Sequence, residues 1–133
     1  ALDERAFCLL ANFKELRNLN LNRSKASDSA LGQIAKLSHL EVLSIADNVH
    51  VTDAGIKKLA SLKYLQRLDV GNTSVTADGI LALRGIDLRS IRLSSRYKNP
   101  QTQTRLQQAF PHAGIEFDLD RPRMPSELFA PLH

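Results

Sequence analysis

The chain has 133 residues, a formal net charge of +4 and 43% hydrophobic residues, which suits one ordinary globular domain. No apolar run approaches the roughly 18 residues of a membrane-spanning helix, so we expect no contact with a membrane. The single cysteine excludes an internal disulfide and cysteine-based metal clusters, and it favours a reducing, cytoplasmic location. No leader peptide is visible, because charged residues follow Ala1 at once, but a removed leader would leave no trace.

Residues 2–15 carry the first helical pattern. Phe7, Leu10 and Phe13 fall three residues apart, which places them on one face of a helix. We expect this face to point into the core, and the segment to be the helical half of a repeat whose strand is absent. Leu9 falls on the outer surface of that helix. Two interpretations stay open: a slightly apolar helix surface, or a surface that more protein covers.

A six-residue phrase follows at positions 16–21, with leucine first, leucine fourth and an aliphatic residue sixth. The phrase returns at Leu40, Leu65 and Leu88, so the intervals are 24, 25 and 23 residues. Self-similarity at this period indicates stacked supersecondary units. The fourth and sixth positions lie on one face of a β-strand. We expect these strands to pair in parallel, because the segments between them are long enough for the crossovers that parallel pairing needs.

The segments between the phrases have helical spacing. In residues 52–62, the aliphatic residues fall three apart at Ile56, Leu59 and Leu62. Thr52 is a suitable N-cap, and Asp53 suits the positive end of a helix. The neighbouring segments match this pattern at Leu31, Ile34, Leu37, Ile80, Leu83 and Ile86.

The pattern changes after Leu93, where a polar loop begins. Asn99 and Pro100 then provide an N-cap followed by proline at the first helical position, which predicts a helix over 101–110.

Residues Gly114–Phe117 have the composition of a last strand, with Ile115 aligned on Ile91. We therefore assign residues 1–119 to one repeat domain. Residues 120–133 contain three of the five prolines, and we expect them to form an extended tail.

The four phrases, with Val51-Thr52-Asp53-Ala54-Gly55-Ile56 after the second, resemble leucine-rich repeats of the variant common in bacterial repeat proteins and F-box-type substrate adaptors. The resemblance covers about residues 2–119. It implies an α/β solenoid with a parallel concave sheet of about five short strands and helices on the convex side. It also implies a module that binds another macromolecule, usually a protein, on the concave face, as the recognition part of a longer protein. Fold alone does not fix function.

The resemblance further implies a column of asparagines, three residues after each strand's last aliphatic residue, whose amides bind the neighbouring turns. Here that column contains Ser24, Asn48, Thr73 and Arg96. Serine and threonine can partly replace the amide, but arginine cannot. We therefore expect this ladder to loosen at the fourth repeat.

Binding on the concave face would use the side chains that alternate away from the core. The first half is neutral and rich in amides, whereas the second half gathers arginines, which suit carboxylate or phosphate and are enriched in binding hot spots. The candidate partner-binding residues are Asn18, Asn20, Arg67, Asp69, Arg89, Arg92 and Arg96. We expect a protein partner with an acidic surface; nucleic acid or another polyanion is the alternative. A plain solvated face explains the same residues equally well.

No constellation of residues speaks for catalysis. The chain lacks a glycine-rich phosphate loop and a G-x-S-x-G elbow. Its histidines lack the spacing of metal ligands, and its aromatic content of 5% is too low for a base-stacking platform. We expect a protein that is not an enzyme, with no cofactor, no metal and no small-molecule substrate.

Overall fold

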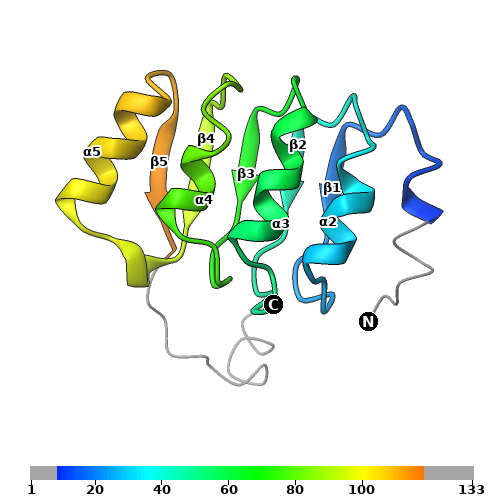
Figure 1. The fold of residues 1–133 in the computed structure, drawn as a ribbon, viewed down its shortest axis with the longest axis horizontal. Coiled ribbons are helices and arrows are strands. Elements are labelled where there is room, and N and C mark those ends of the chain that lie inside the picture. Colours follow the sequence, from blue (N-terminus) through cyan, green and yellow to red (C-terminus); the bar gives the residue numbers. More distant parts are fainter. Residues whose placement is uncertain (1–8, 119–133) are drawn as a thin grey trace, which may run out of the picture.

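The computed structural model describes residues 9–118, which form a five-stranded parallel sheet in the order β1-β2-β3-β4-β5. Each strand therefore pairs with the next one along the chain (Figure 1). The strands are β1 (Asn18–Asn20), β2 (Val42–Ser44), β3 (Arg67–Asp69), β4 (Ser90–Leu93) and β5 (Gly114–Phe117). This arrangement confirms the α/β solenoid with about five short parallel strands. Within residues 9–118, no helix is long and apolar enough to cross a membrane.

The crossovers between strands are short helices that form one layer on a single side of the sheet (Figure 1). They are α2 (Asp28–Ile34), α3 (Asp53–Lys57) with the 3₁₀ turn η1 (Lys58–Ser61), α4 (Ala77–Leu81), the 3₁₀ turn η2 (Ser95–Tyr97) and α5 (Pro100–Ala109). The predicted N-caps are confirmed at two of them. Thr52 Oγ1 accepts a hydrogen bond from Ala54 N at 3.3 Å, and Asn99 Oδ1 accepts one from Thr102 N at 2.7 Å.

The core is a stack of aliphatic rows between the sheet and the helices. The strand register aligns one central row, Leu19, Leu43, Leu68, Ile91 and Ile115. Its three middle members are buried, and Leu19 and Ile115 at the two ends are half-buried. The helical positions predicted from spacing are buried, at Leu31, Ile34, Leu37, Ile56, Leu59, Leu62, Ile80, Leu83 and Ile86. Full burial of one such side chain contributes roughly 1.5–3 kcal/mol, so each repeat is stabilised by stacking on its neighbours.

A carboxylate clasp joins successive helices. Asp28 Oδ1 accepts from Thr52 N at 2.8 Å, and Asp28 Oδ2 accepts from Thr52 Oγ1 at 2.5 Å. Asp53 binds Thr76 in the same way, at 2.7 and 2.6 Å. The sequence suggested that Asp53 serves its own helix end; the structure adds a bond to the next repeat that we had not predicted.

Glycine makes room for this clasp. A Cβ at Gly55 would overlap Asp28 Oδ1 and lie 2.7 Å from Leu31 Cδ1. At Gly79, a Cβ would overlap Asp53 Oδ1 in the same way. The Thr-x-x-Gly spacing therefore forms a socket for the aspartate of the preceding repeat.

The asparagine column is complete only at Asn48, which is 2% exposed. Its amide nitrogen donates to the carbonyls of Leu21 and Ile45, both at 2.9 Å. Its Oδ1 accepts from the backbone N–H groups of Ser24 and Ala26, at 3.2 and 2.9 Å. One side chain therefore ties the turn of the first repeat to that of the second.

The later members of the column stay within their own repeats. The Thr73 hydroxyl donates to Val70 O at 2.7 Å and accepts from Val75 N at 3.2 Å. Arg96 is exposed, and its Nε donates to Ser94 Oγ at 3.3 Å. The fourth repeat lacks the cross-repeat bond, as expected, but the third repeat lacks it too, so the ladder loosens one repeat earlier than predicted.

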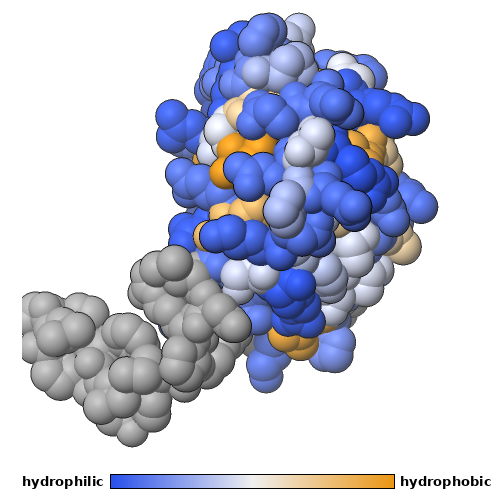
Figure 2. All heavy atoms as spheres, turned by 90° about the vertical axis from the view of Figure 1, so that its left-hand side faces the viewer, coloured by the Kyte–Doolittle hydropathy of each residue, from blue (hydrophilic) through white to orange (hydrophobic). Residues whose placement is uncertain are grey.

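The two ends of the solenoid present different surfaces. Phe13 was expected to point inward like Leu62, but it is 59% exposed, so that prediction is wrong. The helix ends at Leu10 and the chain continues in turns, so the three-residue spacing no longer sets one face. The opposite end, formed by α5 and β5, is mostly hydrophilic with small, separate apolar patches (Figure 2).

Two sequence-based expectations fall outside the described residues. One is the helical pattern before Leu9, which includes Phe7. The other is the proline-containing tail, residues 120–133.

Candidate functional site

The outward side chains of the sheet form two rows, which together we name the strand face. The register places Asn18, Val42, Arg67 and Ser90 in the first row. It places Asn20, Ser44, Asp69, Arg92 and Glu116 in the second row. Neighbouring parallel strands lie about 4.8 Å apart, so each row sets polar groups of successive repeats side by side.

The first half of the strand face is neutral, as the sequence indicated. Asn18 and Asn20 are both exposed, and Asn20 Oδ1 accepts from Asn22 N at 3.0 Å. Val42 is half-buried beside them. Arg67 is exposed in the same row, and within residues 9–118 it forms no ion pair. Arg67 therefore has a guanidinium available to a partner.

Arg92 lies between two carboxylates, because the register sets Asp69 on one side of it and Glu116 on the other. It is also half-buried. The second row therefore carries one arginine and two acidic residues. The strand face is of mixed charge rather than a uniformly basic patch.

Burial raises the pKa of Asp69 above its usual range. The hydrogen bond that it accepts from Gly71 N, at 2.9 Å, and the charge of Arg92 both act to lower this pKa. The charges of Asp118 and Asp47 raise it further. Three carboxylates thus gather where the strands end, and Asp118 is itself bonded, since its Oδ1 accepts from Ser95 N at 3.1 Å.

The remaining two candidates, Arg89 and Arg96, lie beyond opposite ends of β4. Arg89 precedes β4, and its Nη2 donates to Asp87 Oδ2 at 2.9 Å. Arg96 follows β4, and its guanidinium carbon lies 5.8 Å from the centroid of the Tyr97 ring. The structure therefore brings Asn18, Asn20, Arg67, Asp69 and Arg92 onto one face, with Arg89 and Arg96 outside it.

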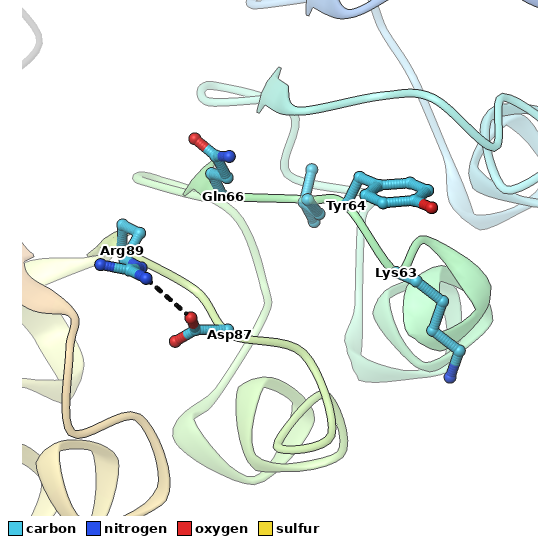
Figure 3. Close-up of a pocket in the computed structure, with 6 residues that line it drawn as sticks. Lys63, Tyr64, Gln66, Asp87 and Arg89 are labelled. Carbon is cyan, nitrogen blue, oxygen red and sulfur yellow. Dashed lines mark hydrogen bonds and ion pairs between the residues drawn. The ribbon is translucent and has the colours of Figure 1, made fainter.

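Sequence reasoning missed a groove at the edge where β3 and β4 begin, which we name the entry groove (Figure 3). Its volume is about 280 Å³. It is lined by Lys63, Tyr64, Leu65, Gln66, Asp87 and Arg89. The one signal in the sequence was an aromatic residue, Tyr64, immediately before the first leucine of a strand phrase.

No metal centre is visible among residues 9–118. In that range, no group of three or more His, Cys, Asp or Glu residues could hold a metal ion. Every buried side-chain nitrogen or oxygen described there has a hydrogen-bond partner.

No protein-family model matches the chain, and no curated protein sequence matches it significantly. Among solved structures, leiomodin-1 actin-binding site 2 matches with a TM-score of 0.66 and 15% identity, over 91% of this chain and 83% of that chain. The tropomodulin C-terminal domain of Caenorhabditis elegans matches with a TM-score of 0.63 and 14% identity, over 90% and 85%. A leucine-rich-repeat protein of Leptospira interrogans is 30% identical with a TM-score of 0.49, over 65% of this chain and 21% of that one.

The first two identities are so low that these likenesses concern the fold alone. Together with the repeating strand phrase and the five parallel strands, they define the class of fold. The chain is a leucine-rich-repeat-type solenoid.

Proposed function

We propose that this chain is a protein-binding module whose partner docks on the strand face. The main support is Arg67, which is exposed at the centre of the first row and forms no ion pair among the described residues. Arginine is a frequent hot-spot residue, because its planar guanidinium makes paired hydrogen bonds to carboxylates. Neutral Asn18 and half-buried Val42 lie in the same row, so the face combines polar and apolar contact groups.

A protein partner suits this face better than a nucleic acid. Asp69 and Glu116 flank Arg92 in the second row, and Asp118 lies close enough to affect the pKa of Asp69. Phosphate backbones carry a dense negative charge, which such carboxylates repel. A folded protein can instead offer acidic groups to Arg67 and donors to the carboxylates. We therefore favour a partner whose docking surface is acidic opposite the first row.

The test compares two charge reversals of the same kind. Arg67→Glu changes the strand face, and Arg84→Glu changes an exposed arginine on the helical half of the same repeat. Wild type and both variants, immobilised at equal density, are exposed to an extract of the source cells, and the retained proteins are quantified by mass spectrometry. We expect some proteins of the extract to be retained by wild type and by Arg84→Glu but not by Arg67→Glu. Retention by Arg67→Glu equal to that of wild type would rule out the strand face.

Two purified probes complete the experiment. Actin is the first protein to test, because a neighbour of the same fold is named as an actin-binding site. Heparin tests the polyanion alternative, in which binding persists at physiological salt and weakens steeply as salt rises. The association rate with a protein partner should also fall with salt, but moderately, because only a few charges steer the encounter.

A further inference from the structure

The entry groove lies between two turns that lead into neighbouring strands. One wall carries Tyr64 and Gln66 before β3, and the other carries Asp87 and Arg89 before β4 (Figure 3). Pockets that enclose whole ligands usually measure about 300–1,000 Å³. At about 280 Å³, and open to solvent, the entry groove is sized for one or two side chains of a larger partner.

Tyr64 is an exposed anchor with a supported ring. It is 63% exposed, although a ring of this size contributes strongly to binding when it is covered. The His39 ring stacks on it, with 6.3 Å between centroids and 9° between planes. His39 belongs to the repeat before Tyr64, whereas the opposite wall of the groove belongs to the repeat after it. The stacking therefore restrains the Tyr64 ring from the side away from the groove. Of the exposed large hydrophobic residues in the range 9–118, only Tyr64 lines this groove.

The opposite wall holds a positioned cation. Asp87 Oδ2 accepts from Arg89 Nη2 at 2.9 Å, and Asp87 Oδ1 lies 3.1 Å from His112 Nδ1. Both oxygens of the carboxylate are therefore engaged, so a basic ligand would have to displace one of these bonds. Arg89 has five N–H donors and uses one of its nitrogens for Asp87, which leaves donors for an incoming carboxylate.

Gln66 adds a group suited to a peptide backbone. Its side-chain amide is exposed and makes no hydrogen bond to any residue in the described part of the chain. An amide can both donate to a carbonyl and accept from an N–H, which is what an extended peptide presents. The groove thus combines an apolar wall, a cation and an amide within one short stretch.

We propose that the entry groove is an anchor site for an acidic peptide segment of the protein partner, with an aliphatic side chain next to a carboxylate. The aliphatic group packs on Tyr64, and the carboxylate binds Arg89. This inference rests on the proposed function and specifies the chemistry of the partner. It also assigns a role to Arg89, which the strand face does not include.

The test uses three capped tripeptides and backbone amide chemical shifts of the ¹⁵N-labelled protein. Ac-Leu-Glu-Leu-NH₂ should shift the amides of residues 63–66 and 87–89. Ac-Ala-Glu-Ala-NH₂ should bind at least about fivefold more weakly, because it lacks the apolar contact. Ac-Leu-Lys-Leu-NH₂ should cause no comparable shift, because Arg89 repels its charge.

Tyr64→Ala should weaken binding of Ac-Leu-Glu-Leu-NH₂ about tenfold, whereas Val49→Ala, which shortens another exposed apolar side chain, should leave it unchanged. Unchanged peak positions elsewhere in each spectrum verify that the variants are folded. Shifts outside the groove, equal binding by Tyr64→Ala, equal binding of the lysine peptide, or no shift with any peptide would each overturn the proposal. None of these results would affect the proposed function, which depends on Arg67 and a different assay.

Discussion

The middle repeats and the fourth repeat differ in how polar side chains bind their turns and helix starts. In the middle, Asn48 and Asp28 each reach across to a neighbouring repeat. In the fourth repeat, Asn99 caps its own helix, and the chain tightens into the 3₁₀ turn η2. Side-chain bonds also link it to neighbouring repeats: Arg105 Nη2 donates to Asp78 Oδ1 at the surface, at 2.7 Å, and Asp118 Oδ1 accepts from Ser95 N after the last strand, at 3.1 Å.

This difference indicates two kinds of stability in one solenoid. Polar side chains couple the middle repeats directly, in addition to the coupling through the apolar rows. The fourth repeat relies on apolar stacking, on local bonds and on an ion pair between Arg105 and Asp78, which is exposed and therefore contributes little. In a linear array, the strength of coupling between neighbours decides how far a local defect spreads. We therefore expect equivalent substitutions to cost more in the middle than near the fourth repeat.

The largest expected effect is that of Asn48→Ala. The substitution removes five hydrogen bonds and leaves the N–H groups of Ser24 and Ala26 without an acceptor. An unsatisfied buried group costs about 1–3 kcal/mol, so we expect the free energy of unfolding to fall by about 3 kcal/mol. Urea unfolding followed by circular dichroism measures this loss.

The matched substitution at the same column position is Arg96→Ala. Because Arg96 is exposed and makes one long bond to Ser94, its loss should cost less than about 0.5 kcal/mol. Similar losses for both variants would show that the asparagine column does not distinguish the two regions.

A smaller loss is expected from Gly55→Ala. The new Cβ would overlap Asp28 Oδ1, so the clasp on Thr52 must shift, at a cost of about 1–3 kcal/mol. Gly85→Ala is the control, because a Cβ there has no atom within 4 Å. Thermal unfolding should separate the two variants clearly.

A double substitution tests whether the clasp is the cause. Removing the carboxylate in Asp28→Ala relieves the overlap of a Cβ at position 55 with Asp28, which leaves the contact with Leu31 Cδ1 at 2.7 Å. The combined variant Asp28→Ala/Gly55→Ala should therefore be more stable than the sum of the single losses predicts. Strict additivity would place the strain of Gly55→Ala somewhere other than the clasp.

The smallest effect is expected from Asp69→Asn, at the end of β3. Burial raises the pKa of Asp69 in the folded chain above its unfolded value, so the charged form is disfavoured by folding. The stability associated with this group is full below the unfolded pKa and declines as the pH rises through the folded pKa. Asp69→Asn, which keeps an acceptor for Gly71 N, should therefore stabilise the protein at pH 7.

The gain should be less than about 1 kcal/mol, because Asp69 is only half-buried and solvent screens its charge. It should vanish near pH 3, where Asp69 is protonated in both states. Urea unfolding at the two pH values provides the comparison, with Glu15→Gln at an exposed carboxylate as the control. A loss of stability at pH 7 would mean that the attraction between Asp69 and Arg92 outweighs the cost of burial.

The rows of the core were predictable because each repeat places the same residue class at the same spacing. Leu43, Leu68 and Ile91 could be aligned by position alone, and the structure pairs them accordingly. The helix start at Asn99 followed from local chemistry, since cap and proline are adjacent in the sequence. Short-range patterns of this kind fix the elements and their order.

The clasp and the entry groove were not predictable by the same means. Asp28 and Thr52 are 24 residues apart, and their contact depends on the distance between stacked helices. The position of Arg89 depends on Asp87, a pairing that competes with any placement on the strand face. The prediction that Phe13 is buried was wrong for a related reason, because the helix before it ends at Leu10. Contacts between side chains of different repeats can be identified only from the three-dimensional arrangement of the repeats.

The clasp also makes the second repeat a modular part. Within four residues, Thr52 and Gly55 form the socket that receives Asp28 of the preceding repeat. Asp53 supplies the carboxylate that binds Thr76 of the following repeat. A tandem duplication of this repeat would bring both halves with it and could lengthen the array without new side chains. A duplication of the third repeat would lack the carboxylate, because Ala77 occupies the position that corresponds to Asp53. Growth of the array by duplication therefore favours one unit over its neighbour.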